Sequence, residues 1–167
     1  MTEMDVFLAF FRSSRERTLG TLGKIEAEAQ PVAVLGWRPG PGRAHIGWQL
    51  LHIAATEELF ATERLVPGSR AAWPELIARF KGGSTPDEQI PSPGQIRETL
   101  TAARDHLEAT LKSLTPTQLD EVPSPIAERG WTFRTVLQVL GWHEAHHQGQ
   151  AHLTYNLWKA AQPQAAR

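Results

Sequence analysis

Residues 131–158 read WTFRTVLQVLGWHEAHHQGQAHLTYNLW, and they are the most informative part of the sequence about the fold. It contains no proline, and its apolar residues recur at three- and four-residue spacing, so the pattern predicts one long helix. His143 and His147 lie four residues apart, which stacks them about one turn from each other on one face. The same face carries a mostly apolar stripe that predicts contact with the core: Val136, Leu140, Ala151, Thr154 and Trp158.

Two imidazoles on a buried face need polar partners, because burying an unpaired polar group costs free energy. A metal ion, a carboxylate or a network of water molecules can meet that need. Two histidines one helical turn apart can close on a single divalent ion. The spacing of His143 and His147 therefore favours a metal site over the alternatives.

The letters of residues 143–147 also match the HExxH pattern of zinc proteases, in which the glutamate is the general base. The rest of the chain argues against a protease. No aspartate or glutamate follows Glu144, so an acidic ligand further along the chain is excluded. The longer pattern HExxHxxGxxH is not met either, because Gly149 and His152 each come one residue too early. A third ligand must come from upstream.

Three histidines precede the motif, and they differ in their expected depth. His52 lies in the middle of a predicted helix, at a depth that matches a site midway along the last helix. The predicted metal site is therefore His52, His143 and His147. His45 lies near the start of the same helix, where it either borders the site and supports a ligand or is an exposed polar residue. We expect His106 at the surface.

Two further residues of the motif are candidates for supporting roles. Glu144 points away from the ligand face, so we expect it to support a ligand indirectly or to lie at the surface. His146 is turned from the His147 side toward a neighbouring helix or solvent. The sequence assigns no catalytic residue.

Twelve prolines divide the chain, and four long windows without proline remain between them. Because proline disrupts helix interiors, these windows are where long helices fit. With no alternating strand pattern, the chain is predicted to be all-α, a four-helix bundle in a single domain of residues 1–167. The connection between the second and third long helices, residues 67–93, is predicted to contain a short helix at 73–80. The four long helices are predicted near residues 3–29, 43–66, 94–114 and 132–160.

Composition excludes several classes of protein. With 17 basic and 18 acidic residues and no basic run, the chain gives no sign of binding nucleic acid or an anionic membrane. No window approaches the roughly 20 apolar residues that span a bilayer. Cysteine is absent, so disulfides, thiolate ligands and a cysteine nucleophile are excluded. We expect a cytoplasmic protein, and we expect a homodimer because Trp73 and Phe80 are predicted to be exposed.

Two segments resemble a known family. Residues 46–57 read IGWQLLHIAATE, and residues 142–150 read WHEAHHQGQ about 90 residues later. Together they resemble the DinB/YfiT-like superfamily, and the likeness extends over nearly the whole chain. The second segment is the more specific of the two. In that superfamily one histidine of the second helix and an HxxxH pair of the last helix bind a divalent metal, which corresponds here to His52, His143 and His147.

The resemblance also implies a class of function. Described members include thiol-dependent S-transferases and a thiol-dependent isomerase, so it implies a metal-dependent enzyme that joins a low-molecular-weight thiol to a small electrophilic substrate. Zinc or nickel is the expected ion, because imidazole ligands suit both. A metal-dependent hydrolase is one alternative, since a bound ion can also activate water. A non-catalytic, stress-related binding or dimerisation module is the other.

Overall fold

The computed structural model describes residues 1–162, so the last five residues of the predicted domain, 163–167, lie outside the described part. All regular structure among residues 1–162 is helical, which confirms the all-α prediction. The α-helices are α1 (Glu3–Glu26), α2 (Pro31–Gly36), α3 (Ile46–Leu59), α4 (Pro74–Phe80), α5 (Pro93–Lys112) and α6 (Phe133–Ala161). A π-helical turn η1 (Phe60–Arg64) extends α3, and two 3₁₀ segments, η2 (Pro116–Asp120) and η3 (Ser124–Arg129), lead into α6.

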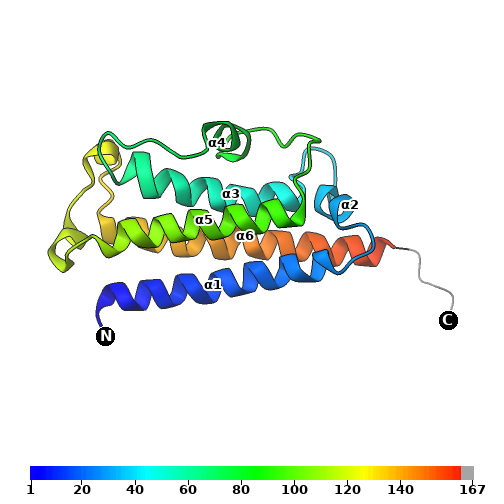
Figure 1. Ribbon diagram of the computed structural model, residues 1–167, viewed down its shortest axis with the longest axis horizontal. Helices are drawn as coiled ribbons and strands as arrows, with labels where there is room; N and C mark the ends of the chain where they lie inside the picture. The colour runs from blue at the N-terminus through cyan, green and yellow to red at the C-terminus, as the bar shows by residue number, and fades with distance from the viewer. Residues whose placement is uncertain (163–167) are drawn as a thin grey trace.

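The four long helices α1, α3, α5 and α6 lie side by side (Figure 1). Helices α1 and α6 run in one direction, and α3 and α5 run in the opposite direction. The connection from α3 to α5 crosses over the outside of α3 and carries α4. Helix α3 is therefore enclosed on every side, and Gln49 is its only residue that is not buried.

Side-chain caps fix where all four long helices begin, and His45 caps α3. Thr2 and Asp5 form a reciprocal capping box at the start of α1, and Ser92 and Gln95 form another at the start of α5. The Thr132 side chain accepts a hydrogen bond from the backbone of α6. These caps satisfy backbone donors that the first turn of a helix leaves without partners.

A network of four buried charged side chains ties the long helices together. Each helix contributes one member: Arg15 from α1, Glu57 from α3, Arg104 from α5 and Glu144 from α6. Arg15 donates to both carboxylates at 2.7 Å, and Arg104 also donates to both, at 2.5 Å in the case of Glu144. Their exposed fractions lie between 1% and 6%, so the four charges compensate one another away from water. We call this set the ion quartet.

The structure corrects several predicted boundaries. The second long helix begins at Ile46 rather than 43, because the side chain of His45 caps it, and its last turn is π-helical. The first ends at Glu26 rather than 29. Outside the predicted helices, the residues after Pro31 form α2, and the residues between α5 and α6 form η2 and η3. Proline begins α2, and short segments of this kind carry too few residues for a periodic pattern to show.

The short helix predicted at 73–80 is confirmed as α4. Its aromatic residues are not exposed as expected. Phe80 is 2% exposed, and Trp73 is half-buried against the core, because α4 folds back onto α3. No helix among residues 1–162 has the length and hydropathy that crossing a bilayer requires.

We predict that Arg15→Met lowers the free energy of unfolding by about 3–5 kcal/mol, because it leaves two buried carboxylates with one guanidinium. Arg12→Met is the matched control. Arg12 is on the same helix and pairs with Glu108, but its side chain is 59% exposed. Its loss should cost about 1 kcal/mol or less. Urea unfolding of both variants tests this, and equal losses would contradict a stabilising role for the ion quartet.

Candidate metal centre

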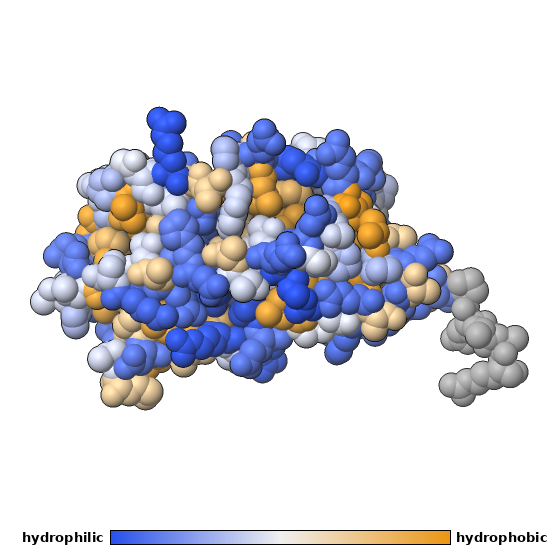
Figure 2. Space-filling view, in the orientation of Figure 1, coloured by the Kyte–Doolittle hydropathy of each residue, from blue (hydrophilic) through white to orange (hydrophobic). Residues whose placement is uncertain are grey.

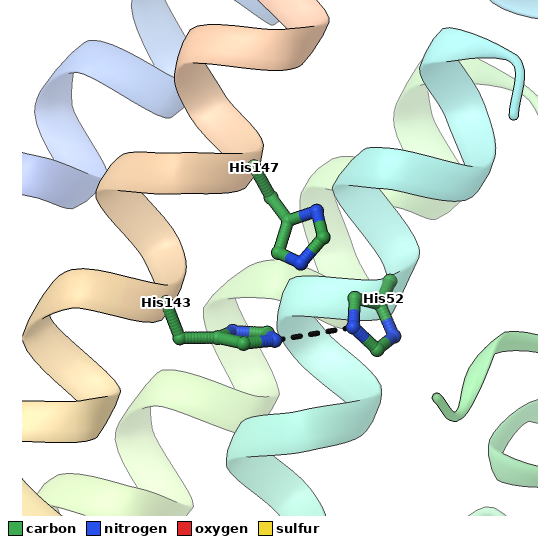
Figure 3. Close-up of side chains that lie close together, drawn as sticks. All are labelled: His52, His143 and His147. Carbon is green, nitrogen blue, oxygen red and sulfur yellow. Dashed lines mark hydrogen bonds between the residues drawn. The ribbon is translucent and has the colours of Figure 1, made fainter. Parts of the chain in front are cut away.

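Three histidine rings from two helices face one another between α3 and α6 (Figure 3). His52 comes from α3, and His143 and His147 come from successive turns of α6. One ring nitrogen from each residue lies within 4.8 Å of the other two, so the group could hold a metal ion. The fold thus brings together the three residues that the sequence analysis selected as ligands.

The hydrogen bonds of two rings determine which nitrogen is free to bind. Nδ1 of His52 lies 2.6 Å from the carbonyl oxygen of Phe80. A carbonyl only accepts, so Nδ1 carries the proton and a neutral ring keeps its lone pair on Nε2. Nδ1 of His147 lies 2.5 Å from Oε1 of Gln49, which fixes that ring in the same way. Such outer hydrogen bonds are typical of histidines that bind metals.

The spacing of the nitrogens also suits an ion. Nε2 of His143 lies 3.1 Å from Nε2 of His52 and 3.4 Å from Oγ1 of Thr56. Nitrogens bound tetrahedrally to zinc at about 2.1 Å lie about 3.4 Å from each other. The separations of 3.1 Å and up to 4.8 Å in the structure bracket this value. The donor set therefore fits a divalent ion that accepts imidazole nitrogen.

Burial keeps these rings neutral, which is the form that binds metal. Burial and the neighbouring His52 lower the pKa of His143 to about 3. Burial and the neighbouring His143 likewise lower the pKa of His147 to about 3. Burial also lowers the pKa of His52, although its hydrogen bond to Phe80 partly opposes the shift. The three rings are thus uncharged at neutral pH without a metal.

The site is closed on one side and open on the other. The Trp48 ring stacks on His52 with centroids 4.6 Å apart, and its Nε1 donates to Ser84 at 3.2 Å. His52 is 7% exposed, while His143 and His147 are half-buried, so the open side lies along α6. Three protein ligands and an open side are the features of a catalytic rather than a structural zinc site.

The other upstream histidines lie away from the three rings. His45 is the N-cap of α3, where its Nδ1 accepts from the backbone of Trp48 at 3.0 Å. His45 is fully buried, so its alternative placement as an exposed residue is wrong. It contacts the backbone of Trp48, and the ring of Trp48 stacks on His52. His106 is partly exposed, as expected, and lies 2.9 Å from the buried carboxylate of Glu58.

The two supporting candidates on α6 have different environments. Glu144 is 1% exposed and belongs to the ion quartet, so its alternative placement at the surface is wrong. Because the side chain of Glu144 points into the core, it is not placed to act as a general base. His146 is exposed, stacks on Trp142 at 4.8 Å, and meets the ring of His147 edge-on at 5.0 Å.

Three groups that contact the histidines of the candidate site were not predicted from the sequence. Gln49 and Thr56 lie three residues before and four residues after His52, so helical spacing places them on its face and could have identified them. The carbonyl of Phe80 has no such signal, because it is a backbone group that any residue would supply. Its position depends on how α4 folds back onto α3.

Comparison with known proteins identifies one family. The sequence model of the family described as the DinB superfamily matches residues 10–151, a range that contains all three histidines. No curated protein and no solved structure matches the chain.

We predict that His147→Ala abolishes stoichiometric binding of zinc or nickel, because two ligands hold a divalent ion far less tightly than three. His106→Ala is the control, since His106 is partly exposed and lies outside the group. Metal content of the purified variants, measured by plasma mass spectrometry, tests the assignment. Equal metal content in the two variants would refute it.

The lowered pKa values predict how stability depends on pH without metal. A histidine whose folded pKa is about 3 stays neutral in the native state, but the unfolded chain takes up its proton near pH 6.5. The unfolded state then binds more protons, so stability falls as pH drops below about 6.5. Urea unfolding at about pH 7 and 5.5 should show this loss. The double variant His143→Gln, His147→Gln should show a smaller one, and an unchanged pH dependence would exclude these rings as its cause.

Proposed function

The chain belongs to the DinB superfamily, and we propose on this basis that its three-histidine centre makes it a metal-dependent enzyme. We also infer that α1, α3, α5 and α6 form the four-helix bundle of the DinB/YfiT-like type within a single domain. The observation that carries the proposal is the arrangement of His52 and His147. Both rings present Nε2 lone pairs to one point, and each is fixed from behind by an oxygen acceptor.

We propose zinc or nickel as the ion that His52, His143 and His147 hold, because neutral imidazole suits both metals. A divalent ion at such a site leaves positions open and lowers the pKa of a thiol or water molecule that binds there. The protein residues around the site orient the ligands. Gln49 and the carbonyl of Phe80 hold two rings, and Trp48 prevents rotation of His52 by stacking on it.

The proposed reaction is transfer of a low-molecular-weight thiol to a small electrophilic substrate. The chain has no cysteine, so a sulfur nucleophile must enter as a separate molecule. A bond forms between the thiol sulfur and an electrophilic carbon as the bond to the leaving group breaks, and the thiol proton departs with the leaving group. We take the cytoplasm as the site of action, because small thiols are kept reduced there. The thiol-dependent transferases of the superfamily support this choice over hydrolysis.

We predict product formation only when metal, thiol and electrophile are all present. The metal-loaded protein is incubated with a panel of small electrophiles, with and without low-molecular-weight thiols, and the products are identified by mass spectrometry. His147→Ala should lose the activity, and His106→Ala should keep it.

The other outcomes separate the alternatives. Turnover of an electrophile by water, without thiol, would replace the transferase with a hydrolase at the same site. Absence of turnover with every thiol, in protein that binds metal stoichiometrically, would favour a non-catalytic binding or dimerisation module.

A further inference from the structure

One half-buried arginine differs from the others in having no acidic partner. Seven arginines of residues 1–162 are buried or half-buried, and Arg64, the last residue of η1, is one of them. The other six each form an ion pair with a carboxylate: Arg15, Arg38, Arg79, Arg97, Arg104 and Arg134. Within the described chain no carboxylate pairs with Arg64. Even the neighbouring Glu63 accepts instead from the backbone of Ala71, at 3.3 Å.

Elsewhere in the fold, arginines that bridge helices are given carboxylates. The face over α5 and α1 is mainly hydrophilic (Figure 2). Two ion pairs join these helices, Arg97 with Glu26 and Arg12 with Glu108, and Arg12 is paired although its side chain is 59% exposed. A charge that is partly removed from water without a partner costs free energy. The position of Arg64 therefore calls for an anion that the chain itself does not supply.

A second cation lies beside Arg64. Segment η3 contacts η1 and carries the exposed Arg129, whose guanidinium lies over the ring of Trp131 at 5.1 Å. Burial and the nearby charge of Arg129 lower the pKa of Arg64. Like charges repel, so placing two guanidinium groups together is unfavourable unless an anion contacts both. We call Arg64 and Arg129 the arginine pair.

The guanidinium of Arg64 is directed toward the metal centre. Thr56, Phe60 and Arg64 follow His52 at steps of four residues, so they lie on successive turns. The guanidinium lies 4.6 Å from the centre of the Phe60 ring, one turn nearer the histidines than its own backbone. The next turn is that of Thr56, which contacts His143. The positive charge therefore lies about one helical turn, roughly 5.4 Å, beyond Thr56.

The histidines themselves register this charge. Burial is the main cause that lowers the pKa of His52 and of His143, and the charge of Arg64 adds to the lowering in both. The α6 side of the intervening seam is not sealed. Val139 and Thr135 lie one and two turns before His143 on α6, and both are half-buried. Because α6 runs antiparallel to α3, these turns lead from the histidines toward Arg64.

We propose that the arginine pair binds the anionic group of the molecule that enters the metal centre. A guanidinium presents a planar fork of donors that matches a carboxylate or a phosphate. In the proposed thiol transfer, on which this further step rests, that molecule is a thiol with an acidic group. With one helical turn between Thr56 and the guanidinium, a linker of about two or three carbons between sulfur and acid spans the distance.

The test compares three thiols of similar length and different charge. They are 3-mercaptopropionate, the neutral 2-mercaptoethanol and the cationic cysteamine, and isothermal titration of the zinc-loaded protein measures the dissociation constant of each. Wild type should bind 3-mercaptopropionate roughly 10-fold or more tightly than 2-mercaptoethanol, which is the effect of a charge-assisted hydrogen bond. Cysteamine should bind most weakly, because the arginine pair repels it.

Two variants separate the arginine pair from general charge. Arg64→Met keeps an apolar side chain over Phe60, and it should lower the preference for 3-mercaptopropionate about 10-fold while binding 2-mercaptoethanol as wild type does. Arg70→Met removes an exposed arginine six residues further along and should keep the full preference. Comparing the preference between proteins cancels the intrinsic differences between the thiols. Circular dichroism of each variant checks that the helices are retained.

A second measurement requires neither metal nor thiol. Phenylglyoxal modifies arginine side chains, and peptide mass spectrometry follows the rate at each position in the metal-free protein. Acetate and inorganic phosphate, added separately, should slow modification of Arg64 and leave that of Arg70 unchanged. The more protective of the two identifies carboxylate or phosphate as the group that the arginine pair prefers.

These measurements also distinguish the failure of this proposal from that of the thiol transferase. Zinc-loaded protein that binds none of the three thiols would count against thiol transfer, while protection of Arg64 by anions would still support the arginine pair as an anion site. Equal affinity of wild type for the charged and neutral thiols would overturn the proposal. So would a preference that survives in Arg64→Met, or modification of Arg64 that neither anion slows.

Discussion

The mutual compensation of charge within the ion quartet sets the register of the four long helices. Two guanidinium groups and two carboxylates lie almost out of contact with water, one from each long helix. A helix that slid by one turn would leave a charge buried and unpaired, which is among the most costly defects a core can have. The position of the candidate metal centre depends on this register. Glu57 follows Thr56, which contacts His143, and His143 precedes Glu144, so fixing the two carboxylates also fixes the neighbouring histidine of α6 relative to α3.

The ion quartet also explains why the HExxH letters mislead. In that pattern the glutamate must face the metal together with its histidines. Successive residues of a helix are rotated by about 100°, so a glutamate directly after a ligand is directed to a different side unless the site is built around it. Here that side is the core, where Arg15 and Arg104 hold the carboxylate of Glu144. In this chain the glutamate of the HExxH letters therefore stabilises the fold and is not placed to transfer a proton.

The sequence allowed the helices and the clustering of His52, His143 and His147 to be predicted because both rest on spacing along the chain. Proline-free windows marked the long helices, and an HxxxH pair with a histidine at matching depth marked the site. The core charges were missed because helical periodicity is read from apolar residues. Glu57 and Arg15 are charged residues that do not belong to the apolar pattern, yet both are buried. Only the arrangement of all four helices shows that their charges meet. The same holds for the carbonyl of Phe80, whose place beside His52 depends on a long connection rather than on a local pattern.

Helix α6 has three sides with different environments. One side enters the core and carries Glu144, a second faces α3 and carries the two candidate histidine ligands, and a third is exposed and carries Trp142, Gly149 and Leu153. Buried ion pairing accounts for the residues of the first side, and the histidine cluster accounts for those of the second. Neither explains the third, because a lysine or glutamate in place of Leu153 would disturb neither the core nor the ligands. Exposed positions that are free of other constraints tend to acquire charge, as α1 and α5 have done. On this third side no charged residue is exposed between Arg134 and Lys159, so α6 differs from α1 and α5 in the composition of its solvent-facing side.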